Sequence, residues 1–436
     1  MITAAIGLAI LLALLLVGIP LGLGMFLVGF FGFAAVHARG FRSSFSVAGQ
    51  QMMDLALNYN FSVLPLFVLM GVFVARAALS DDLFDAAQKW LGHMKGGLAL
   101  STVAACAGFA AVSGSSAATA ATMTKAAMPS MRRHGYADWL STGTLASGGT
   151  IGVLIPPSAA LIIFGLLTEQ DIGKLFMAGV GPGILTLVLY FAVIQIVTRL
   201  FPGVGPSAER WSWADRLHAL GKTWGVVVLF ILVLGGLFLG VFTPTEAGGI
   251  GAVGALLFAI LRRKMSVRIF VDSLIEAAET TAMIFAVAFG ALVLNQFINL
   301  SGMPEDLLEI LSRYEASPMM VVFLIIIAYI ILGMFLDGMS MIFLTVPIFA
   351  PVVMHLDFSM DDTLIWWGIV TVMMVEISLI TPPVGMNVFI IKAMLPEVPL
   401  SSIFKGIAPF FIADVIRLAV LLILPSVALW LPGVMF

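Results

Sequence analysis

The chain has 436 residues, of which 61% are hydrophobic and 10% charged, and a formal net charge of −3. Its mean hydropathy of +1.13 assigns most of it to lipid, and the absence of a basic surplus argues against nucleic acid as a partner. Cys106 is the single cysteine, which excludes an intramolecular disulfide and a CxxC metal or redox site. The N-terminus lacks the Lys or Arg of a signal-peptide n-region, so we expect the first apolar segment to be retained.

The first half of the chain alternates apolar segments of membrane-crossing length with shorter amphipathic and polar ones. Residues 2–36 are interrupted at Gly18-Ile19-Pro20 and are expected to form one kinked or strongly tilted helix. Residues 96–131 have two apolar arms around the polar tip Ser113-Gly114-Ser115-Ser116. Each arm is marginal for a full crossing, so a re-entrant hairpin is expected. The other predicted elements are a crossing at 54–75, an amphipathic surface helix at 80–90, an interrupted apolar run at 139–167, a crossing at 182–201 and a polar linker at 202–222.

The second half repeats this order. Its predicted elements are a tight pair of crossings at 224–242 and 246–261, a crossing at 280–300, an amphipathic helix at 304–314, apolar arms flanking Asp337-Gly338-Met339-Ser340, an interrupted run at 364–394 and a final crossing at 407–431. Three pairs of matching segments lie at nearly the same separation: Pro156-Pro157 with Pro382-Pro383, 176–182 with 403–409, and 79–83 with 303–307. Three ordered matches at one separation indicate a duplicated unit.

The two interrupted runs carry the functional argument. Glycines and paired prolines break Ala146–Ser158, and the same pattern breaks Ser378–Gly385. A broken backbone at membrane depth is tolerated only where protein or a watery cavity satisfies the freed groups. A simple proline kink would explain one such run. Recurrence at matching positions of two repeats instead points to the binding site of a transporter.

The distribution of positive charge predicts the orientation. If the loops at 132–133, 199–222 and 262–268 are cytoplasmic, most of the 21 Lys and Arg lie on the same side, as the positive-inside rule requires. Arg39 and Arg42 then lie on the opposite side, against the rule, and the acidic loop at 355–362 is periplasmic. In this orientation the first hairpin opens to the cytoplasm and the second to the periplasm, so the repeats are inverted.

Bringing each hairpin tip against the broken helix of its own repeat would build one oxygen-lined cation site per repeat. Na⁺ prefers hard oxygen donors, and carbonyls with hydroxyls suffice without a carboxylate. Half-helix N-termini at the tips would direct positive dipole ends toward an anionic substrate between the two sites. The expected residues are Ser113, Gly114, Ser115, Ser116, Ser147, Gly149 and Thr150 for the first sodium site; Gly338, Met339, Ser340, Ser378 and Thr381 for the second; and Ser116, Ser158, Gly385 and Asn387 for the substrate. No cofactor is expected beyond coupling sodium ions.

Several charged and nucleophilic residues have competing interpretations. Asp337 and Glu376 lie beside the predicted sites and are costly in lipid, so each is either functional or structurally paired. Lys125 either reaches cytoplasmic water from a hairpin arm or binds substrate. Ser113-Gly114-Ser115 is not expected to be a protease nucleophile, because His93 and His134 fall at cytoplasmic ends, away from it. We therefore expect no enzyme activity.

Five motifs in unbroken order resemble the large membrane (M) subunit of TRAP (tripartite ATP-independent periplasmic) transporters, over about Pro65 to Pro409. They are Ser113–Ala120, Pro129 with Gly135-Tyr136, Ala146–Ser158, Gly333–Asp337 and Leu379–Asn387. The resemblance implies an all-α polytopic protein of the bacterial inner membrane, an elevator-type member of the ion-transporter superfamily with two inverted repeats, each holding a re-entrant hairpin and a broken helix. Ser378 stands where many members of the family have Gly.

The resemblance also implies a function and partners. These are sodium-coupled uptake of a small organic acid (a carboxylate), a small four-helix membrane subunit (Q-type) and a periplasmic solute-binding protein (P-type) that delivers the substrate. The expected division is 1–75 for N-terminal scaffold helices, 76–201 for the first repeat core, 202–300 for the linker and further scaffold helices, and 301–436 for the second repeat core. The rival interpretation is a stand-alone ion or organic-anion carrier of the same superfamily that needs no binding protein.

Overall fold

The computed structural model is all-helical and describes residues 2–77, 79–313, 317–358 and 360–435. The helices of the first half are α1 (Ile2–Leu16), α2 (Leu21–Val36), α3 (Phe41–Leu57), the 3₁₀ turn η1 (Tyr59–Ser62), α4 (Val63–Arg76), α5 (Leu79–Leu91), α6 (Gly97–Ser113), α7 (Ser116–Arg133), α8 (Asp138–Thr150), the 3₁₀ turn η2 (Ile151–Val153), α9 (Ala159–Thr168) and α10 (Ile172–Leu200). Those of the second half are α11 (Trp213–Lys222), α12 (Trp224–Phe238), α13 (Pro244–Leu261), α14 (Val267–Leu300), α15 (Met303–Arg313), α16 (Pro318–Gly333), α17 (Gly338–Met354), α18 (Thr363–Ser378), α19 (Met386–Met394), α20 (Leu400–Ile423) and α21 (Ser426–Met435).

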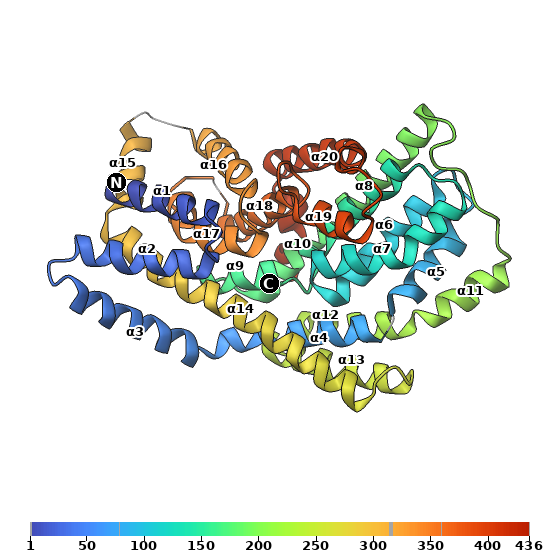
Figure 1. Ribbon diagram of the computed structural model, residues 1–436, viewed down its shortest axis with the longest axis horizontal. Helices are drawn as coiled ribbons and strands as arrows, with labels where there is room; N and C mark the ends of the chain where they lie inside the picture. Colours follow the sequence, from blue (N-terminus) through green and yellow to red (C-terminus); the bar gives the residue numbers. More distant parts are fainter. Residues whose placement is uncertain (1, 78, 314–316, 359, 436) are drawn as a thin grey trace.

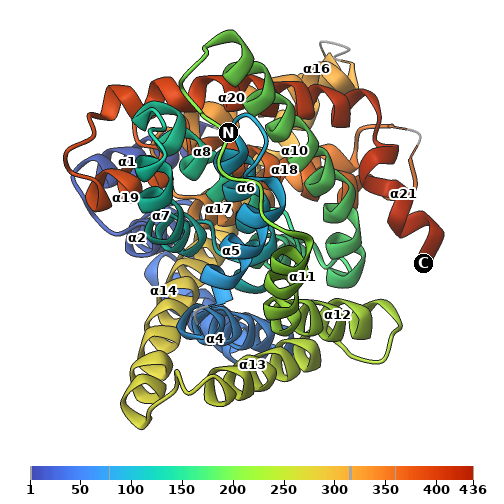
Figure 2. The same cartoon turned by 90° about the vertical axis from the view of Figure 1, so that its right-hand side faces the viewer.

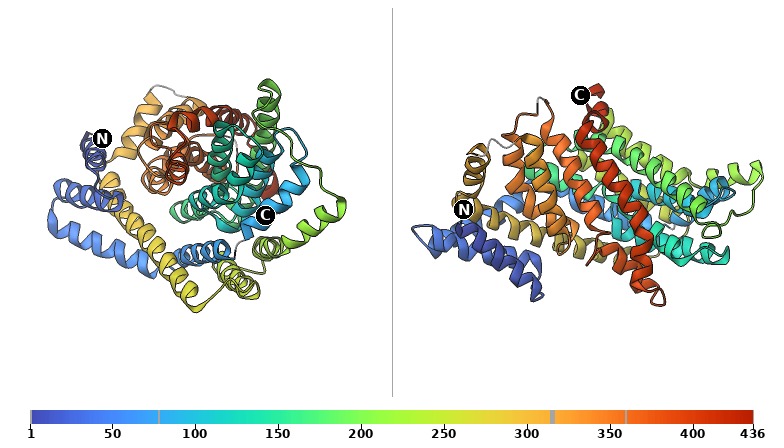
Figure 3. Two further views of the ribbon diagram at one scale, coloured as in Figure 1. Left: turned by 45° about the vertical axis from the view of Figure 1, so that its right-hand side comes forward. Right: turned by 90° about the horizontal axis from the view of Figure 1, so that it is seen from above.

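The helices form two groups (Figure 1). Helices α2, α3, α4, α13 and α14, blue and yellow, lie along one side, and the bundle that contains α5–α10 and α16–α20 lies on the other. Figure 2 keeps this arrangement, with α4, α12, α13 and α14 together at its lower edge, and the left panel of Figure 3 shows the blue and yellow helices along one side. The 34-residue α14 is the longest member of its group and packs against α2 and α4. Gly290 and Gly22 let α14 and α2 touch backbone to backbone, because a Cβ on Gly290 would lie 2.1 Å from the carbonyl oxygen of Gly22.

Within the described residues, five helices are long and apolar enough to cross a membrane. They are Tyr59–Arg76, Ile172–Leu200, Pro244–Leu261, Val267–Leu300 and Leu400–Ile423. Helices α11 and α12, bent by 49° at the residue between them, would make a sixth if they form one span. The structure also has several shorter apolar helices, including both arms of the second hairpin, beside these candidate spans.

The single kinked helix predicted for residues 2–36 is wrong. The structure has two helices, α1 and α2, that run antiparallel: Gly7 lies against Val28 while Gly24 lies against Leu11. The reversal takes place at Gly18, whose φ of 89° is in the left-handed region that glycine adopts without strain.

Other boundaries differ because polar caps begin or end helices that hydropathy misses. Residues 41–57 form α3, which the sequence analysis left unassigned up to residue 53, and Asn58 ends it by accepting a hydrogen bond from the Asn60 amide at 3.0 Å. Part of the predicted polar linker is helical: Ser212 caps α11. Ser266 likewise starts α14 thirteen residues before the predicted crossing at 280.

The final predicted crossing, 407–431, is also corrected. It begins seven residues earlier, at Leu400, ends at Ile423, and is followed after Leu424 and Pro425 by the separate short helix α21. Proline cannot continue a helix from the preceding turn, which accounts for the break. In the first half, α10 begins at Ile172 rather than 182 and contains Pro182 inside it.

The sequence prediction of hairpins and interrupted helices is confirmed at the level of the helices. Helices α6 and α7 flank the first tip, α16 and α17 flank the second, and both double-proline segments are non-helical. The amphipathic helix at 80–90 is α5, which packs on α6 with Leu83 against Gly108. The one predicted at 304–314 is α15, which ends at Arg313; residue 314 lies outside the described residues.

Candidate functional site

The first hairpin tip is built by a left-handed glycine and a serine cap. Gly114 (φ 60°) ends α6, and the Ser115 hydroxyl accepts a hydrogen bond from the Ala118 amide at 3.3 Å to start α7. Thr119 donates to the Ser115 carbonyl at 2.7 Å and lies 3.1 Å from the Ser113 hydroxyl. The tip is therefore a compact group of hydroxyl and carbonyl oxygens.

This tip lies directly on the break of the first interrupted helix. A Cβ on Gly114 would be 2.7 Å from the carbonyl oxygen of Pro157, and one on Gly152 would be 3.3 Å from the carbonyl oxygen of Ser115. The structure thus brings Ser113–Ser116 together with Gly152 and Pro157. Sequence reasoning did not single out Gly152, Pro157 or Thr119 as site residues, although the first two lie inside the double-proline motif.

For the other predicted members of the first site, the structure shows no contact with the tip residues Ser113–Ser116. The Thr150 hydroxyl donates to the Ser147 carbonyl at 2.8 Å. Gly149 lies against Ala120, with the Asn387 amide nitrogen 3.1 Å from where its Cβ would be. The Ser147 hydroxyl is buried and has no hydrogen-bond partner among the described residues.

Ser158, predicted to contact substrate, is occupied within the break itself. It is fully buried, accepts from the Leu161 amide at 3.3 Å as the cap of α9, and donates to the Val153 carbonyl. Asn387 instead joins the two broken helices: its amide donates to the Ala146 carbonyl at 3.1 Å, and its Oδ1 is buried without a partner among the described residues.

The second hairpin repeats the arrangement of the first. Asp337 caps α17 by accepting from the amides of Met339 and Ser340, each at 3.2 Å, and from the Ser340 hydroxyl. This assigns Asp337 a structural pairing, one of the two roles left open for it. Gly333 lies on Ser378, because a Cβ there would be 2.4 Å from the Ser378 Cβ, and Gly338 lies on Val375.

The second break holds the remaining predicted residues. The Ser378 hydroxyl donates to the Val375 carbonyl and the Thr381 hydroxyl to the Ile377 carbonyl, both at 2.6 Å. Gly385 (φ 57°) begins α19. Both serine and threonine hydroxyls keep their lone pairs available, since each uses its proton on a helix carbonyl.

A cavity of about 190 Å³ lies where the tips meet the other helix group. Ser113, Gly114, Ser115 and Pro157 line it from the first repeat and Met339 from the second; Gly71, Glu276 and Thr280 line it from α4 and α14. None of Ser116, Ser158, Gly385 and Asn387, the predicted substrate residues, is among its lining residues. A Cβ on Gly71 would be 2.7 Å from the Ser113 carbonyl oxygen, so α4 touches the tip. Glu276 and Thr280 belong to the polar N-terminal part of α14, which also carries Asp272, and were the available signal for this wall.

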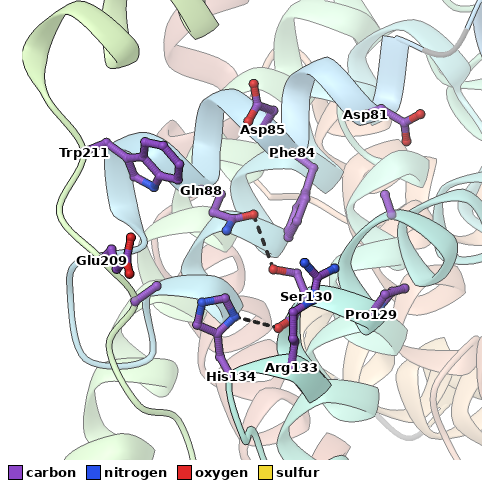
Figure 4. Close-up of a pocket in the computed structure, with 12 residues that line it drawn as sticks. Asp81, Phe84, Asp85, Gln88, Pro129, Ser130, Arg133, His134, Glu209 and Trp211 are labelled. Atoms are coloured by element: carbon purple, nitrogen blue, oxygen red, sulfur yellow. Dashed lines mark hydrogen bonds between the residues drawn. The ribbon is translucent and has the colours of Figure 1, made fainter.

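A second cavity, of about 450 Å³, lies between α5, the end of α7 and residues 208–211 (Figure 4). Ser130 donates to Gln88 at 3.4 Å, and its carbonyl lies 2.8 Å from His134 Nδ1. Asp85 and Arg133 give the lining both signs of charge. It contains none of the predicted site residues, and we keep it separate from the candidate transport site.

Exposed ion pairs hold the loops at the predicted cytoplasmic side. Arg132 lies 2.6 Å from Glu397 and 3.3 Å from Asp138, joining the ends of the first hairpin and the second broken helix. A hydrogen bond from its own backbone, then one from Arg132, lowers the pKa of Glu397. Lys125, on the hairpin arm, is exposed, in keeping with the water-facing interpretation.

A fully buried ion cluster joins α10, α18 and α20. Arg417 lies 2.7 Å from Glu376 and 3.1 Å from Asp414, and it donates to the Thr186 hydroxyl. Tyr190 donates to the Asp414 carboxylate at 2.9 Å. Side-chain exposure is 0% for Arg417 and Glu376 and 2% for Asp414. Glu376 is therefore paired, which sequence reasoning left open, and its partner lies two helices away.

Substituting Gly114 tests the contact between tip and break. Gly114→Ala is expected to lower uptake and thermal stability, because the left-handed backbone costs about 1–2 kcal/mol with a side chain and the new methyl meets the Pro157 carbonyl. Gly135→Ala is the matched control: its φ is 74°, but nothing lies within 4 Å of its added Cβ. Melting temperature and initial uptake rate of the two variants are compared. Equal losses in both would mean that only backbone strain matters.

An all-helical membrane protein with two interrupted helices, each held against a hairpin tip, has the arrangement of a secondary transporter. Similarity to solved structures agrees at the level of the fold. The Neisseria gonorrhoeae MtrF structure gives a TM-score of 0.55, with 88% of this chain and 84% of that chain covered, and the Alcanivorax borkumensis YdaH transporter gives 0.52, with 91% and 90% covered. Both are 13% identical in sequence.

The family model described as "Tripartite ATP-independent periplasmic transporter, DctM component" matches residues 8–427, and the chain belongs to that family. The resemblance to the large TRAP subunit is thereby confirmed, and the protein is a multi-pass membrane permease and not an enzyme. Three relatives illustrate the family. The chain is 33% identical to the C4-dicarboxylate TRAP transporter large permease protein DctM of Pseudomonas aeruginosa, with 88% of each covered. It is 31% identical to the ectoine TRAP transporter large permease protein TeaC of Halomonas elongata, with 98% of each covered. It is 29% identical to the isethionate TRAP transporter permease protein DctMQ of Oleidesulfovibrio alaskensis, covering 96% of this chain and 65% of that protein.

Proposed function

We propose that this chain carries out sodium-coupled secondary uptake of a small organic acid across the bacterial inner membrane by an elevator mechanism. Membership of the TRAP family supports uptake through a multi-pass permease. The relative named for C4-dicarboxylates supports a carboxylate substrate. The orientation in which most Lys and Arg are cytoplasmic makes the two repeats inverted, which is the symmetry that alternating access uses.

The observation that carries the proposal is the packing of each hairpin tip on the break of its own repeat. Gly114 meets the Pro157 carbonyl in the first repeat, and Gly333 meets Ser378 in the second. Neutral hydroxyl and carbonyl oxygens gather at both places, as a sodium site requires. We therefore keep the two predicted sodium sites, and add Thr119, Gly152 and Pro157 to the first.

For the substrate we place most weight on Asn387. Its Oδ1 is buried without a partner among the described residues, at the point where the two broken helices meet. Buried polar atoms in native proteins nearly always have partners, so an orphaned oxygen in a transporter is a candidate ligand contact. Ser158 has less support, since its hydroxyl already caps α9. Ser116 and Gly385 are kept as predicted.

The proposed moving unit contains residues 76–201 and 301–436, and the proposed wall contains 1–75 and 202–300. The cavity between the tips and α4 and α14 supports this division, because it lies at the contact between the two parts. Gly71 also supports this division, because α4 has no side chain where it contacts the first hairpin tip. The tip could therefore move along α4 without a steric clash at this position. Helix α11 lies in the linker range and packs on α5 of the proposed moving unit.

Two protein partners complete the proposal: a small four-helix membrane subunit and a periplasmic solute-binding protein. The DctMQ relative supports the first, because this chain covers only 65% of its length. Large apolar side chains left exposed on α2 and α3, including Phe31, Phe41, Phe45 and Met52, give such a subunit a surface to cover. The acidic loop at 355–362, in which residue 359 lies outside the described residues, is the proposed docking edge for the binding protein.

Reconstitution tests the partner requirement. Liposomes holding this chain alone are expected to show only background uptake of a labelled organic acid. Addition of the small subunit and the binding protein is expected to raise uptake well above this background. A panel of C4-dicarboxylates, sugar acids, ketoacids and ectoine identifies the substrate. Robust uptake of free substrate by the isolated chain would instead support the stand-alone carrier.

A further inference from the structure

Helix α11 has one face packed on α5 and an apolar stripe on its exposed side. Arg216 and Ala219 are its buried residues. Trp213, Leu217 and Leu220 are 65%, 59% and 49% exposed, and they recur at the spacing of a single helix face. Figure 1 shows α11 at the outer edge of the molecule, where no other helix covers it. Such a stripe requires an apolar surrounding that the chain itself does not supply.

The same stripe continues onto α12, which indicates lipid as the surrounding. Trp224, Val227 and Ile231 are 53%, 47% and 62% exposed and follow Leu220 at helical spacing. Because α12 is the more apolar part of a candidate membrane span, its exposed side is expected to face acyl chains. The 49° bend between the helices turns α11 away from the direction of α12. An amphipathic helix in this position lies along the membrane surface with its stripe in the lipid.

Exposed basic residues surround the same helix. Residues 209–222 and 262–268 contain seven Lys and Arg and two carboxylates. A hydrogen bond of 3.1 Å from the Arg262 guanidinium to the Lys222 carbonyl brings the two segments together. Five of the seven are exposed and have no ionic partner among the described residues: Arg210, Lys222, Arg263, Lys264 and Arg268. In the orientation that the positive-inside rule selects, these side chains reach the cytoplasmic leaflet, which carries anionic phospholipid.

The two basic segments also hold α5 at both ends. Near the end of α5, the Trp90 Nε1–H donates to the Arg216 carbonyl at 3.2 Å, and the Trp90 ring lies 5.9 Å from that of Trp213. At its start, Asp82 is paired with Arg262. Helix α5 connects α4 of the proposed wall to the first hairpin. A membrane contact that fixes α11 therefore fixes the helix from which this hairpin extends.

We propose that the α11 surface, meaning the stripe Trp213, Leu217 and Leu220 with the five exposed basic residues, binds anionic phospholipid of the cytoplasmic leaflet and so anchors α5. The stripe enters the acyl chains, and the ammonium and guanidinium groups bind headgroup phosphates. Lipid binding by this surface is independent of the proposed function. The anchoring of α5 rests on the proposed elevator and adds a requirement for anionic lipid to it.

A fluorophore on Leu217→Cys measures the lipid contact in the full chain, because Cys106 is the single native cysteine and is buried. The protein is reconstituted in phosphatidylcholine vesicles with increasing fractions of brominated lipid, either phosphatidylglycerol or phosphatidylcholine. Brominated phosphatidylglycerol is expected to quench at a fraction about fivefold lower, the contribution of one Lys or Arg near an anionic surface. High salt should reduce this preference, since exposed charges are screened. A label on Ile231→Cys, farther along the stripe, is expected to show no preference.

Charge variants test the headgroup contact with the label at Leu217. Lys222→Gln with Lys264→Gln is expected to bring the two lipids toward equal quenching. Arg39→Gln with Arg42→Gln removes the same charge from exposed residues on the predicted opposite side and is expected to keep the preference. Equal quenching in the unsubstituted background would overturn the proposal. So would shielding of the label from both lipids on addition of the small membrane subunit, because the stripe would then be a protein interface.

Uptake by the complete system tests the anchoring of α5. Replacing phosphatidylglycerol by phosphatidylcholine in the liposomes is expected to lower the initial rate several-fold, and Lys222→Gln with Lys264→Gln is expected to remove most of this dependence. Equal wild-type rates in the two lipids would overturn the anchoring. Uptake that ignores Na⁺ would instead contradict the proposed function and would leave the quenching result unchanged, so the two failures are distinguishable.

Discussion

Replacing Na⁺ by choline on both sides of liposomes that hold the complete system is expected to reduce uptake to background. The proposed cation sites include neutral hydroxyls and carbonyls from Ser113–Ser116, Gly152 and Pro157 in one repeat and from Ser378 and Thr381 in the other. Such oxygens hold a hard monovalent cation without a carboxylate ligand. The measurement is initial uptake of labelled substrate at fixed pH and membrane potential.

The control reverses the gradient. With Na⁺ inside and choline outside, preloaded substrate is expected to leave through the same protein, since a secondary transporter follows the gradient of its coupling ion. Uptake that continues in choline and responds only to a pH gradient would mean that the proposed sodium sites at the hairpin tips do not couple transport to Na⁺. The tips would then be structural contacts between repeats.

Arg417→Met is expected to produce the largest loss of stability of any single substitution proposed for this chain. It leaves Glu376 and Asp414 buried without their guanidinium. Removing one partner of a buried ion pair costs about 3–5 kcal/mol, a large part of the about 5–15 kcal/mol that stabilises an ordinary folded protein. The yield of monodisperse protein in detergent and its melting temperature should both fall sharply.

Two comparisons make this result specific. Arg132→Gln removes an exposed guanidinium that also contacts two carboxylates and is expected to change stability by no more than about 1 kcal/mol. The triple variant Arg417→Met, Glu376→Gln, Asp414→Asn removes all three charges and is expected to recover much of the lost yield. If Arg417→Met folded as well as wild type, the cluster would contribute little to stability.

The interrupted helices were predictable because proline and glycine act locally. A double proline removes two amide donors wherever it stands, so the breaks after Thr150 and Ser378 follow from the sequence without knowledge of neighbours. The hairpin tips were predictable for a similar reason, since small polar residues between apolar arms mark a turn. The prediction of a single helix for residues 2–36 was wrong because Gly18 and Pro20 are compatible with either a kink or a reversal of the chain. Only the packing of α1 on α2 selects the reversal.

The helices that hydropathy missed share a cause. Helices α3 and α11 have polar faces, so their mean hydropathy is low, and their limits depend on the caps Asn58 and Ser212. Sequence patterns underestimated α14 for the same reason: its first turns carry Asp272 and Glu276 before the apolar part begins. Charged residues at the end of a long helix look like a loop when only composition is considered.

The sequence by itself determined that this protein is a membrane transporter and that its two halves carry matching motifs, because composition, the positions of Pro and Gly, and the order of the motifs are properties of the chain and need no partner. Only the tertiary structure decided which oxygens face one another. In the structure Gly114 contacts the Pro157 carbonyl, and the Asn387 amide donates to the Ala146 carbonyl. The Ser158 hydroxyl caps α9, and Glu376 pairs with Arg417. The reason is physical: a buried polar group takes whichever partner the packing of distant helices brings within about 3 Å, and no local pattern records that choice.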